Sequence, residues 1–181
     1  MARSCSSRPP PDKEDLSNRS NLYVGRAGQL AVMGEFLLRG WNVALPEVDV
    51  GDDVFVVKDE GGDLFRIQVK TATSKPSGKS YTAQFAIGLS QLKTLRTPDL
   101  TYVFAVRHGS NWGPYLIIAR DALRQEHELY RVGGASKEQL ILRLAYEHGR
   151  VRSGKRDLNA FRNDWSRWPV LRDRGKAVKP T

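Results

Sequence analysis

Three side chains of complementary chemistry stand near one another in the segment at residues 46–71, which begins PEVDVGDDVFVV and ends RIQVKT. Asp53 precedes one apolar run, and Gln68 and Lys70 lie in the next. A carboxylate and an amide oxygen are ligands that a hard divalent cation such as Mg²⁺ accepts. An ammonium group can hold a phosphate or orient and activate an attacking water. A bound metal lowers the pKa of that water and stabilises charge on the pentacoordinate phosphate. This combination of residue types is typical of metal-assisted hydrolysis of a phosphodiester.

Two runs rich in Val, Ile and Phe position these side chains. Asp53–Lys58 and Leu64–Thr71 flank a Gly-Gly centre, a pattern that predicts a β-hairpin. A turn centred between the two glycines pairs Asp53 with Lys70. Because residues two apart share a face of a strand, the carboxylate, the amide and the ammonium then line one surface, a grouping that a one-residue slip would break. A half-exposed hairpin whose polar face only meets solvent remains the alternative.

The elements around this hairpin alternate between helix and strand. Between Gly25 and Arg39, apolar residues recur at helical spacing at Leu30, Met33 and Leu37, and Gly40 is placed to end the helix. The further predicted elements are a strand at Trp41–Leu45, a loop at Thr73–Lys79, a strand at Tyr81–Ile87, a short helix at Leu89–Leu95, strands at Tyr102–Arg107 and Tyr115–Ala119, and helices beyond Asp121, of which Lys137–Tyr146 is the clearest. This order predicts an α/β fold in which a mixed sheet is flanked by helices, one on either side.

The Asp-led strand, the short hairpin and the RIQVKT strand resemble the PD-(D/E)xK nuclease superfamily, which includes type II restriction enzymes and archaeal Holliday-junction resolvases. The pattern is most similar to the branch with Gln at the D/E position, that of the group I intron homing endonucleases of cyanobacteria and of bacterial relatives with the same QVK strand. The resemblance covers roughly Asn21 to Leu123 and implies a restriction-endonuclease-like fold. It also implies a DNA endonuclease dependent on Mg²⁺ or Mn²⁺, with Asp53 as the metal-binding Asp, Gln68 at the D/E position and Lys70 as the catalytic lysine.

The first helix departs from the family's pattern. Many relatives carry a Glu there in a G-x-x-G-E arrangement, whereas GRAGQ at residues 25–29 puts Gln29 in that catalytic position. Asp53 is then the single carboxylate assigned to the metal, so the resemblance implies weak metal affinity. Asp49 or Asp52 could assist if the strand bends there. Alternatively, the protein has lost cleavage and kept binding.

The positive charge of the chain is concentrated near its C-terminus. The net charge is +9, and residues 150–181 hold ten Lys and Arg against three Asp and Glu, an excess of seven. Such a segment is typical of a phosphate-binding arm, with Arg162 and Arg167 as candidate contacts, although a solvated tail without a partner is an equal alternative. For the interleaved Trp165 and Trp168, packing of the tail onto the core is favoured over stacking on bases.

A second group of candidate phosphate contacts follows the RIQVKT strand directly. Lys75 and Lys79 flank the predicted loop, where they are placed to touch a DNA backbone. A mobile, solvated loop is the alternative. Nothing in the residues themselves decides between the two.

Composition bounds the class and the compartment. With 181 residues, 40% hydrophobic and 27% charged, the chain reads as globular. We expect residues 1–20 to be a disordered tail, 21–125 the nuclease-like core, and 126–181 a helical, basic C-terminal extension. No apolar stretch reaches the roughly 20 residues that span a bilayer. The first residues lack a secretory signal, and Cys5 is the only cysteine, so we expect a cytoplasmic protein without membrane contact.

The sequence therefore predicts a metal-dependent endonuclease with DNA as its partner, and a homodimer or homo-oligomer is left open. Two other classes remain: a catalytically inactive DNA-binding protein on the same fold, and a structural or regulatory protein without a nucleic-acid partner. The first two differ in metal dependence and in the effect of Lys70→Ala. The third predicts no salt-sensitive binding to DNA.

Overall fold

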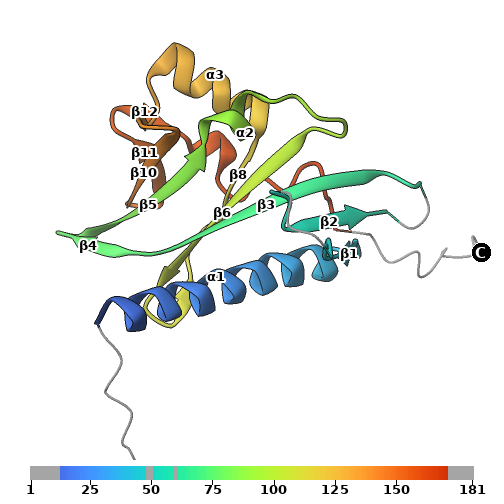
Figure 1. The fold of residues 1–181 in the computed structure, drawn as a ribbon, viewed down its shortest axis with the longest axis horizontal. Coiled ribbons are helices and arrows are strands. Elements are labelled where there is room, and N and C mark those ends of the chain that lie inside the picture. The colour runs from blue at the N-terminus through green and yellow to red at the C-terminus, as the bar shows by residue number, and fades with distance from the viewer. Residues whose placement is uncertain (1–12, 48–50, 59–60, 171–181) are drawn as a thin grey trace, which may run out of the picture.

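The computed structural model describes residues 13–47, 51–58 and 61–170, with side chains from residue 20 onward. Its elements are, in chain order, α1 (Lys13–Leu38), β1 (Asn42–Ala44), β2 (Val54–Val57), β3 (Leu64–Thr73), β4 (Lys75–Ser77), β5 (Ser80–Gly88), α2 (Leu89–Lys93), β6 (Leu100–His108), β7 (Asn111–Trp112), β8 (Leu116–Ala119), α3 (Arg120–Tyr130), β9 (Gly134–Ser136), β10 (Gln139–Glu147), β11 (Arg150–Ser153), β12 (Arg156–Asp157) and the 3-10 turn η1 (Asn159–Phe161). Figure 1 shows α1 lying along a twisted sheet, with further strands crossing above it. The expected α/β class is confirmed.

The first helix begins earlier than the sequence indicates. It already includes residues 13–20, for which the composition predicts disorder; residues 1–12 of that tail lie outside the described part of the chain. The predicted strands at β1, β2, β3, β5, β6 and β8 and the short helix α2 are confirmed. The predicted loop after β3 is instead the short strand β4 and a two-residue turn. Within the described residues, no helix is long and apolar enough to cross a membrane.

The face of α1 that packs on the sheet differs from the one that its leucine spacing predicts. Val32 and Phe36 are fully buried, whereas Leu30 and Leu37 are each more than half exposed. Gly28 faces β3 so closely that a Cβ there would stand 2.2 Å from Thr71 Oγ1. The helix therefore packs on β3 through Gly28, where a residue with a side chain would not fit at this distance.

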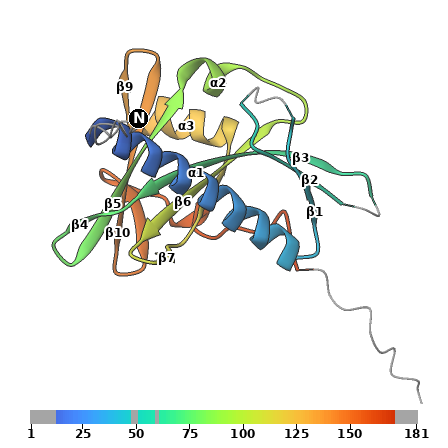
Figure 2. The same ribbon diagram turned by 60° about the horizontal axis from the view of Figure 1, so that its bottom comes forward.

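The first sheet is mixed, as expected. Its path runs β1-β2-β3-β6-β7, and β8 also pairs with β6. Strands β3 and β6 are parallel, from the pair Arg66–Leu100 to the pair Thr73–Arg107, while the other ladders are antiparallel. Figure 2 shows α1 crossing in front of β3 and β6.

The hairpin of β2 and β3 exists, but its predicted register is wrong by two residues. Val54 pairs with Ile67 and Val57 with Leu64. The turn is closed by the Lys58 N–H donating to the Asp63 carbonyl at 3.1 Å, and not by a pairing symmetric about the two glycines. Because the shift is even, it leaves every strand residue on the face that the sequence assigned to it.

A second sheet continues from the first. Its path runs β12-β11-β10-β5-β4, with β9 pairing to β10. Strand β3 leads through Ser74 into β4, so the long β3–β4 segment joins the two sheets, as Figure 1 shows. All ladders of the second sheet are antiparallel.

Two hydrophobic cores fix the layers. One lies between α1 and the first sheet, around Phe36, Ile67 and Val103. The other lies between the two sheets and includes Phe104 and Leu142, with contributions from α2 and α3. The second face of the first sheet is therefore covered mainly by the second sheet, with α2 and α3 contributing to the core on that side.

Up to residue 170, the chain after α3 is built mainly of strands, so the expected helical extension is wrong there. The segment Lys137–Tyr146, predicted as a helix, lies mostly in β10. Leu140, Leu142 and Leu144 are buried while the residues between them face outward. Strand β10 pairs along its length with β5 of the expected core. This pairing provides hydrogen-bond partners for the backbone of β10 and so favours a strand over a helix.

The preferred interpretation of the two C-terminal tryptophans is confirmed. Trp168 is fully buried and Trp165 nearly so. Phe36 of α1 meets them edge to face, with ring centroids 5.3 Å from Trp165 and 5.2 Å from Trp168. The chain is described up to residue 170, and the rest of the basic tail lies outside that range.

Candidate active site

Asp53 lies directly against the strand segment that carries Gln68. Its backbone N–H donates to the Ile67 carbonyl at 2.9 Å, and its carboxylate Oδ2 accepts the Val69 N–H at 2.7 Å. These two hydrogen bonds bracket Gln68, the residue between Ile67 and Val69. The structure thus brings together two of the residues singled out in the sequence, although Asp53 is aligned with Gln68 and not with Lys70.

Gln68 carries an unusual polar group for its position. The residue is 6% exposed, and its Oε1 is buried without a hydrogen-bond partner among the described residues. A buried carbonyl oxygen that accepts no hydrogen bond costs about 1–3 kcal/mol. Such groups are rare in folded proteins, and a functional ligand is one of the explanations that they call for.

Lys70 follows Gln68 on the same face of β3. In the parallel ladder, Gln68 pairs with Tyr102 and Lys70 with Phe104 of β6, and paired residues share a face of a sheet. Lys70 is partly exposed, in contrast to the buried Gln68. The strand therefore places an ammonium group one pleat beyond the amide, closer to solvent.

Gln29 contacts the site through the backbone. Its Nε2 donates to the Asp53 carbonyl oxygen at 2.7 Å, and its Oε1 accepts from Arg26 at 2.5 Å. Both ends of this amide are therefore engaged within the protein. The arrangement suits a residue that fixes the position of Asp53, and a direct catalytic role of Gln29 stays a prediction.

The neighbouring carboxylate, Asp52, is committed elsewhere. It is buried and accepts hydrogen bonds from Arg66 Nε at 3.0 Å and from Arg66 Nη2. The Arg66 Nη1 also donates to the Pro98 carbonyl at 3.3 Å. A buried carboxylate in such a pair is held by its partner, so Asp52 does not act as a second acidic ligand beside Asp53. Asp49 lies outside the described residues.

Sequence reasoning missed Gln91 of α2, which ties down the loop before Asp53. Its Nε2 donates to the Gly51 carbonyl at 2.8 Å, and its Oε1 accepts from the Tyr102 hydroxyl at 3.2 Å. Burial raises the pKa of Tyr102 far above its usual range, so this hydroxyl stays a donor. The only sequence signal was a glutamine on a short predicted helix, which by itself indicates nothing.

The residues present fit a divalent cation, although sparsely. Asp53 offers a carboxylate and Gln68 a buried amide oxygen that lacks a partner, and both are oxygen ligands of the kind that Mg²⁺ uses. No group of three or more His, Cys, Asp or Glu side chains in the described part of the chain could hold a metal. Any cation at this position would keep several waters or take oxygens from a substrate phosphate.

The candidate phosphate contacts lie on different parts of the surface. Lys75 of β4 and Lys79 in the following turn are exposed. Arg162 follows η1, in the bridge to Leu116, and is also exposed. Arg167 is exposed between the two buried tryptophans. Their roles in binding nucleic acid stay predictions.

Comparison with known proteins gives a structural likeness without a sequence match. No family model matches the chain, and no curated protein matches it in sequence. A solved structure of a bacterial homing endonuclease superimposes with a TM-score of 0.47 and 19% sequence identity, over 78% of this chain and 86% of that chain. Because the superposition is partial and the identity low, the functional assignment rests on the residues of the site.

Proposed function

We propose that this protein is a divalent-metal-dependent endonuclease that hydrolyses phosphodiester bonds in DNA. The observation that carries the proposal is the buried Oε1 of Gln68, which has no hydrogen-bond partner among the described residues. The next residue on the strand, Val69, donates its N–H to the Asp53 carboxylate. A buried amide oxygen without a partner calls for an explanation, and a bound cation is one that fits its chemistry. The resemblance of the RIQVKT strand to a nuclease family and the net charge of +9 favour DNA as the substrate.

Each residue of the site then has a distinct task. Asp53 and Gln68 would hold the cation, Mg²⁺ or Mn²⁺. When bound, such a cation makes water more acidic and offsets charge on a phosphate. Lys70 would donate to a non-bridging oxygen of the scissile phosphate or orient the attacking water. Gln29 and Gln91 are positioning residues, because they hold the backbone at Asp53 and Gly51.

One substitution at each of the two charged residues of the site tests this proposal most sharply. Asp53→Asn keeps an oxygen that accepts the Val69 N–H but removes the negative charge. Lys70→Ala removes the ammonium group. The matched controls are Asp63→Asn in the hairpin turn and Lys93→Ala on α2, both at exposed positions. We expect cleavage of supercoiled and linear DNA by the wild type and by both controls, requiring Mg²⁺ or Mn²⁺ and abolished by chelator.

In this assay the two site variants should fold normally and fail to cleave. If Asp53→Asn cleaves at the wild-type rate, the metal assignment is wrong. If Lys70→Ala does so, the role of the lysine is wrong. Thermal unfolding of each variant separates loss of chemistry from loss of structure.

A second function is favoured by one observation: among the described residues, Asp53 is the single carboxylate assigned to the metal. A catalytically inactive DNA-binding protein would bind DNA with a strong salt dependence. It would show no cleavage with any divalent cation, and Asp53→Asn would leave its affinity unchanged. Absence of salt-sensitive binding would exclude both functions.

A further inference from the structure

A long groove crosses the outer face of the second sheet and reaches α1. One part, of about 870 Å³, is lined by α1, the end of β3, β4, β5 and β10. The next part, of about 810 Å³, is lined by β5, β10 and the segments around β9 and β12. The two parts share Gln84, Arg143 and Gly154, so they form one continuous surface. Figures 1 and 2 both place the N-terminal half of α1 on the side of β4 and β5.

The lining of this groove is basic. It includes Lys75, Arg131, Arg143, Lys155 and Arg156, and none of the residues that line either part is acidic. Arg156 is engaged by Glu126, with Nε to Oε2 at 2.7 Å. The other four cations have no ion-pair partner within the part of the chain that the structure describes. They therefore present uncompensated positive charge along the groove.

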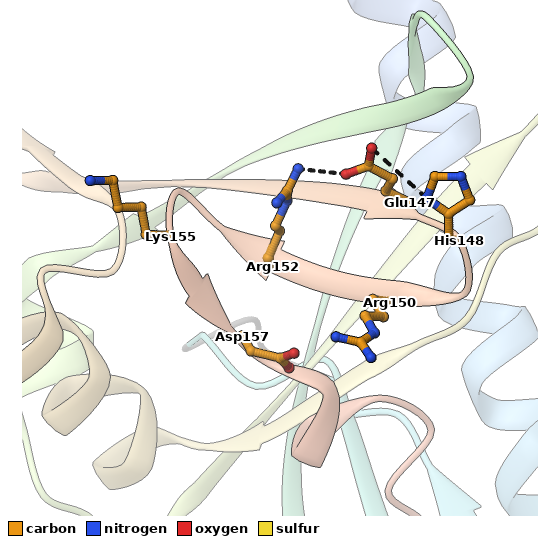
Figure 3. Close-up of a pocket in the computed structure, with 6 residues that line it drawn as sticks. All are labelled: Glu147, His148, Arg150, Arg152, Lys155 and Asp157. Carbon is orange, nitrogen blue, oxygen red and sulfur yellow. Dashed lines mark hydrogen bonds and ion pairs between the residues drawn. The ribbon is translucent and has the colours of Figure 1, made fainter.

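At the far end of the groove, acidic side chains lie among the basic ones. Lys155 also lines the adjoining pocket, which Figure 3 shows with Arg150, Arg152, Glu147, His148 and Asp157. There Glu147 accepts from Arg152 Nη2 at 2.5 Å, and Asp157 adds a second carboxylate. The uncompensated run thus extends from Lys75 through Arg143 to Lys155 and is followed by a mixed surface.

The remaining lining residues suit a polyanion of regular shape more than a folded acidic partner. They are mostly small or uncharged, among them Gly133, Gly134, Ala135, Ser136 and Gly154. Short side chains between long cations let a phosphate backbone approach the sheet closely, since phosphate contacts position nucleic acid without reading its sequence. Strands are among the elements that proteins place in DNA grooves.

The groove also leads toward the candidate active site. Thr71, Ala72 and Thr73 line its first part, and Lys70 is the preceding residue on the same strand. At about 3.3 Å per residue, Thr73 lies roughly 10 Å along the strand from Lys70. A DNA backbone that follows the groove would therefore reach the C-terminal end of β3, next to Lys70.

We infer that this groove, and not the C-terminal tail alone, is the duplex-DNA binding surface, with Lys75, Arg143 and Lys155 contacting phosphates of its backbone. Arg143 is the central contact, because it belongs to both parts of the groove and its Nε is held by Gln84 Oε1 at 3.0 Å. The inference rests on the proposed function for the identity of the ligand. The inference goes beyond the proposed function, because it assigns DNA binding to residues that take no part in the chemistry.

Charge reversals on the full chain test the inference. Arg143→Glu, Lys75→Glu and Lys155→Glu change exposed side chains, and Lys93→Glu on α2 is the matched control outside the groove. The measurement is the affinity for a labelled duplex of random sequence, with chelator present, at salt concentrations from about 50 to about 200 mM. For each phosphate that a variant no longer neutralises, the slope of log affinity against log salt should become shallower by about 0.9. The loss of affinity between the lowest and the highest salt concentration is then about 3.5-fold smaller than in the wild type.

The expected result is a weaker and less salt-dependent affinity for each groove variant, with wild-type behaviour of Lys93→Glu. Wild-type affinity and slope for Arg143→Glu would overturn the inference, whether or not the protein cleaves. Conversely, if the wild type binds through the groove but never cleaves, the proposed chemistry fails and the binding surface stands. Asp53→Asn separates the two further, because it should bind the duplex in chelator as the wild type does.

Discussion

Replacement of Gln68 by methionine is expected to stabilise the metal-free protein and to abolish its cleavage of DNA. Gln68 is 6% exposed, and its Oε1 has no hydrogen-bond partner among the described residues. Methionine has a similar length and carries no amide to desolvate. Removing the unsatisfied oxygen should therefore raise the free energy of unfolding by about 1–3 kcal/mol. For a chain of this size, each kcal/mol corresponds to a rise of about 2–4 °C in the melting temperature.

The control is a second glutamine whose amide is fully engaged. Gln91 donates to the Gly51 carbonyl and accepts from the Tyr102 hydroxyl, so Gln91→Met should lower the free energy of unfolding by about 1–3 kcal/mol. Both variants are compared with the wild type by urea unfolding in chelator. Loss of stability in Gln68→Met as large as that in Gln91→Met would refute the reasoning, because it would mean that the protein itself satisfies the Gln68 amide.

Adding the metal should narrow the difference in stability between Gln68→Met and the wild type. A ligand that binds only the folded state stabilises it by about 1.4 kcal/mol at ten times its Kd. The wild type should gain this stabilisation with Mg²⁺ or Mn²⁺, and Gln68→Met should not. An equal gain in both proteins would place the metal elsewhere.

The site, the helix packing and the tail give three further predictions. Gln68→Glu should bind Mg²⁺ and Mn²⁺ more tightly in calorimetry, since an anionic ligand attracts the cation more strongly than an amide dipole; an unchanged affinity would argue that residue 68 is not a ligand. Gly28→Ala places a Cβ 2.2 Å from Thr71 Oγ1 and should cost about 1–3 kcal/mol of stability, with part of the loss recovered when Thr71→Ala is added; additive effects of the two changes would contradict the close packing. Reversing the charges of the exposed Arg162 and Arg167 leaves the buried tryptophans in place, so DNA affinity at low salt that equals the wild type's would remove these two residues from the interface.

The local pattern of the sequence predicted the hairpin but not its register. Alternation along β2 and β3 is equally satisfied by pairings that differ by two residues, because both keep every side chain on its face. The glycine pair suggested the centre of the turn, whereas the hydrogen bond from Lys58 to Asp63 closes the loop one residue earlier. Asp53 and Gln68 still lie on the same face of the hairpin, because a shift of two residues changes the paired residue but not the face.

Strand β10 shows why the C-terminal architecture could not be predicted. The segment LILRLAY at residues 140–146 has apolar residues at both helical and alternating spacing. Its pairing with β5, far away in the chain, decides for the strand. Long-range pairing also hid the groove, because Arg143 and Lys75 come together only when β10, β5 and β4 form one sheet. The burial of Gln68, which carries the functional proposal, is likewise a tertiary property that the residue type does not reveal.

Single-turnover cleavage of duplex DNA by Asp53→Asn tests the central claim most directly. This variant retains an acceptor for the Val69 N–H and lacks the negative charge that would hold the cation. With saturating protein and Mg²⁺, we predict a rate at least about 100-fold below the wild type, with unchanged unfolding in chelator and unchanged DNA affinity. Cleavage at the wild-type rate by a folded Asp53→Asn would contradict the account.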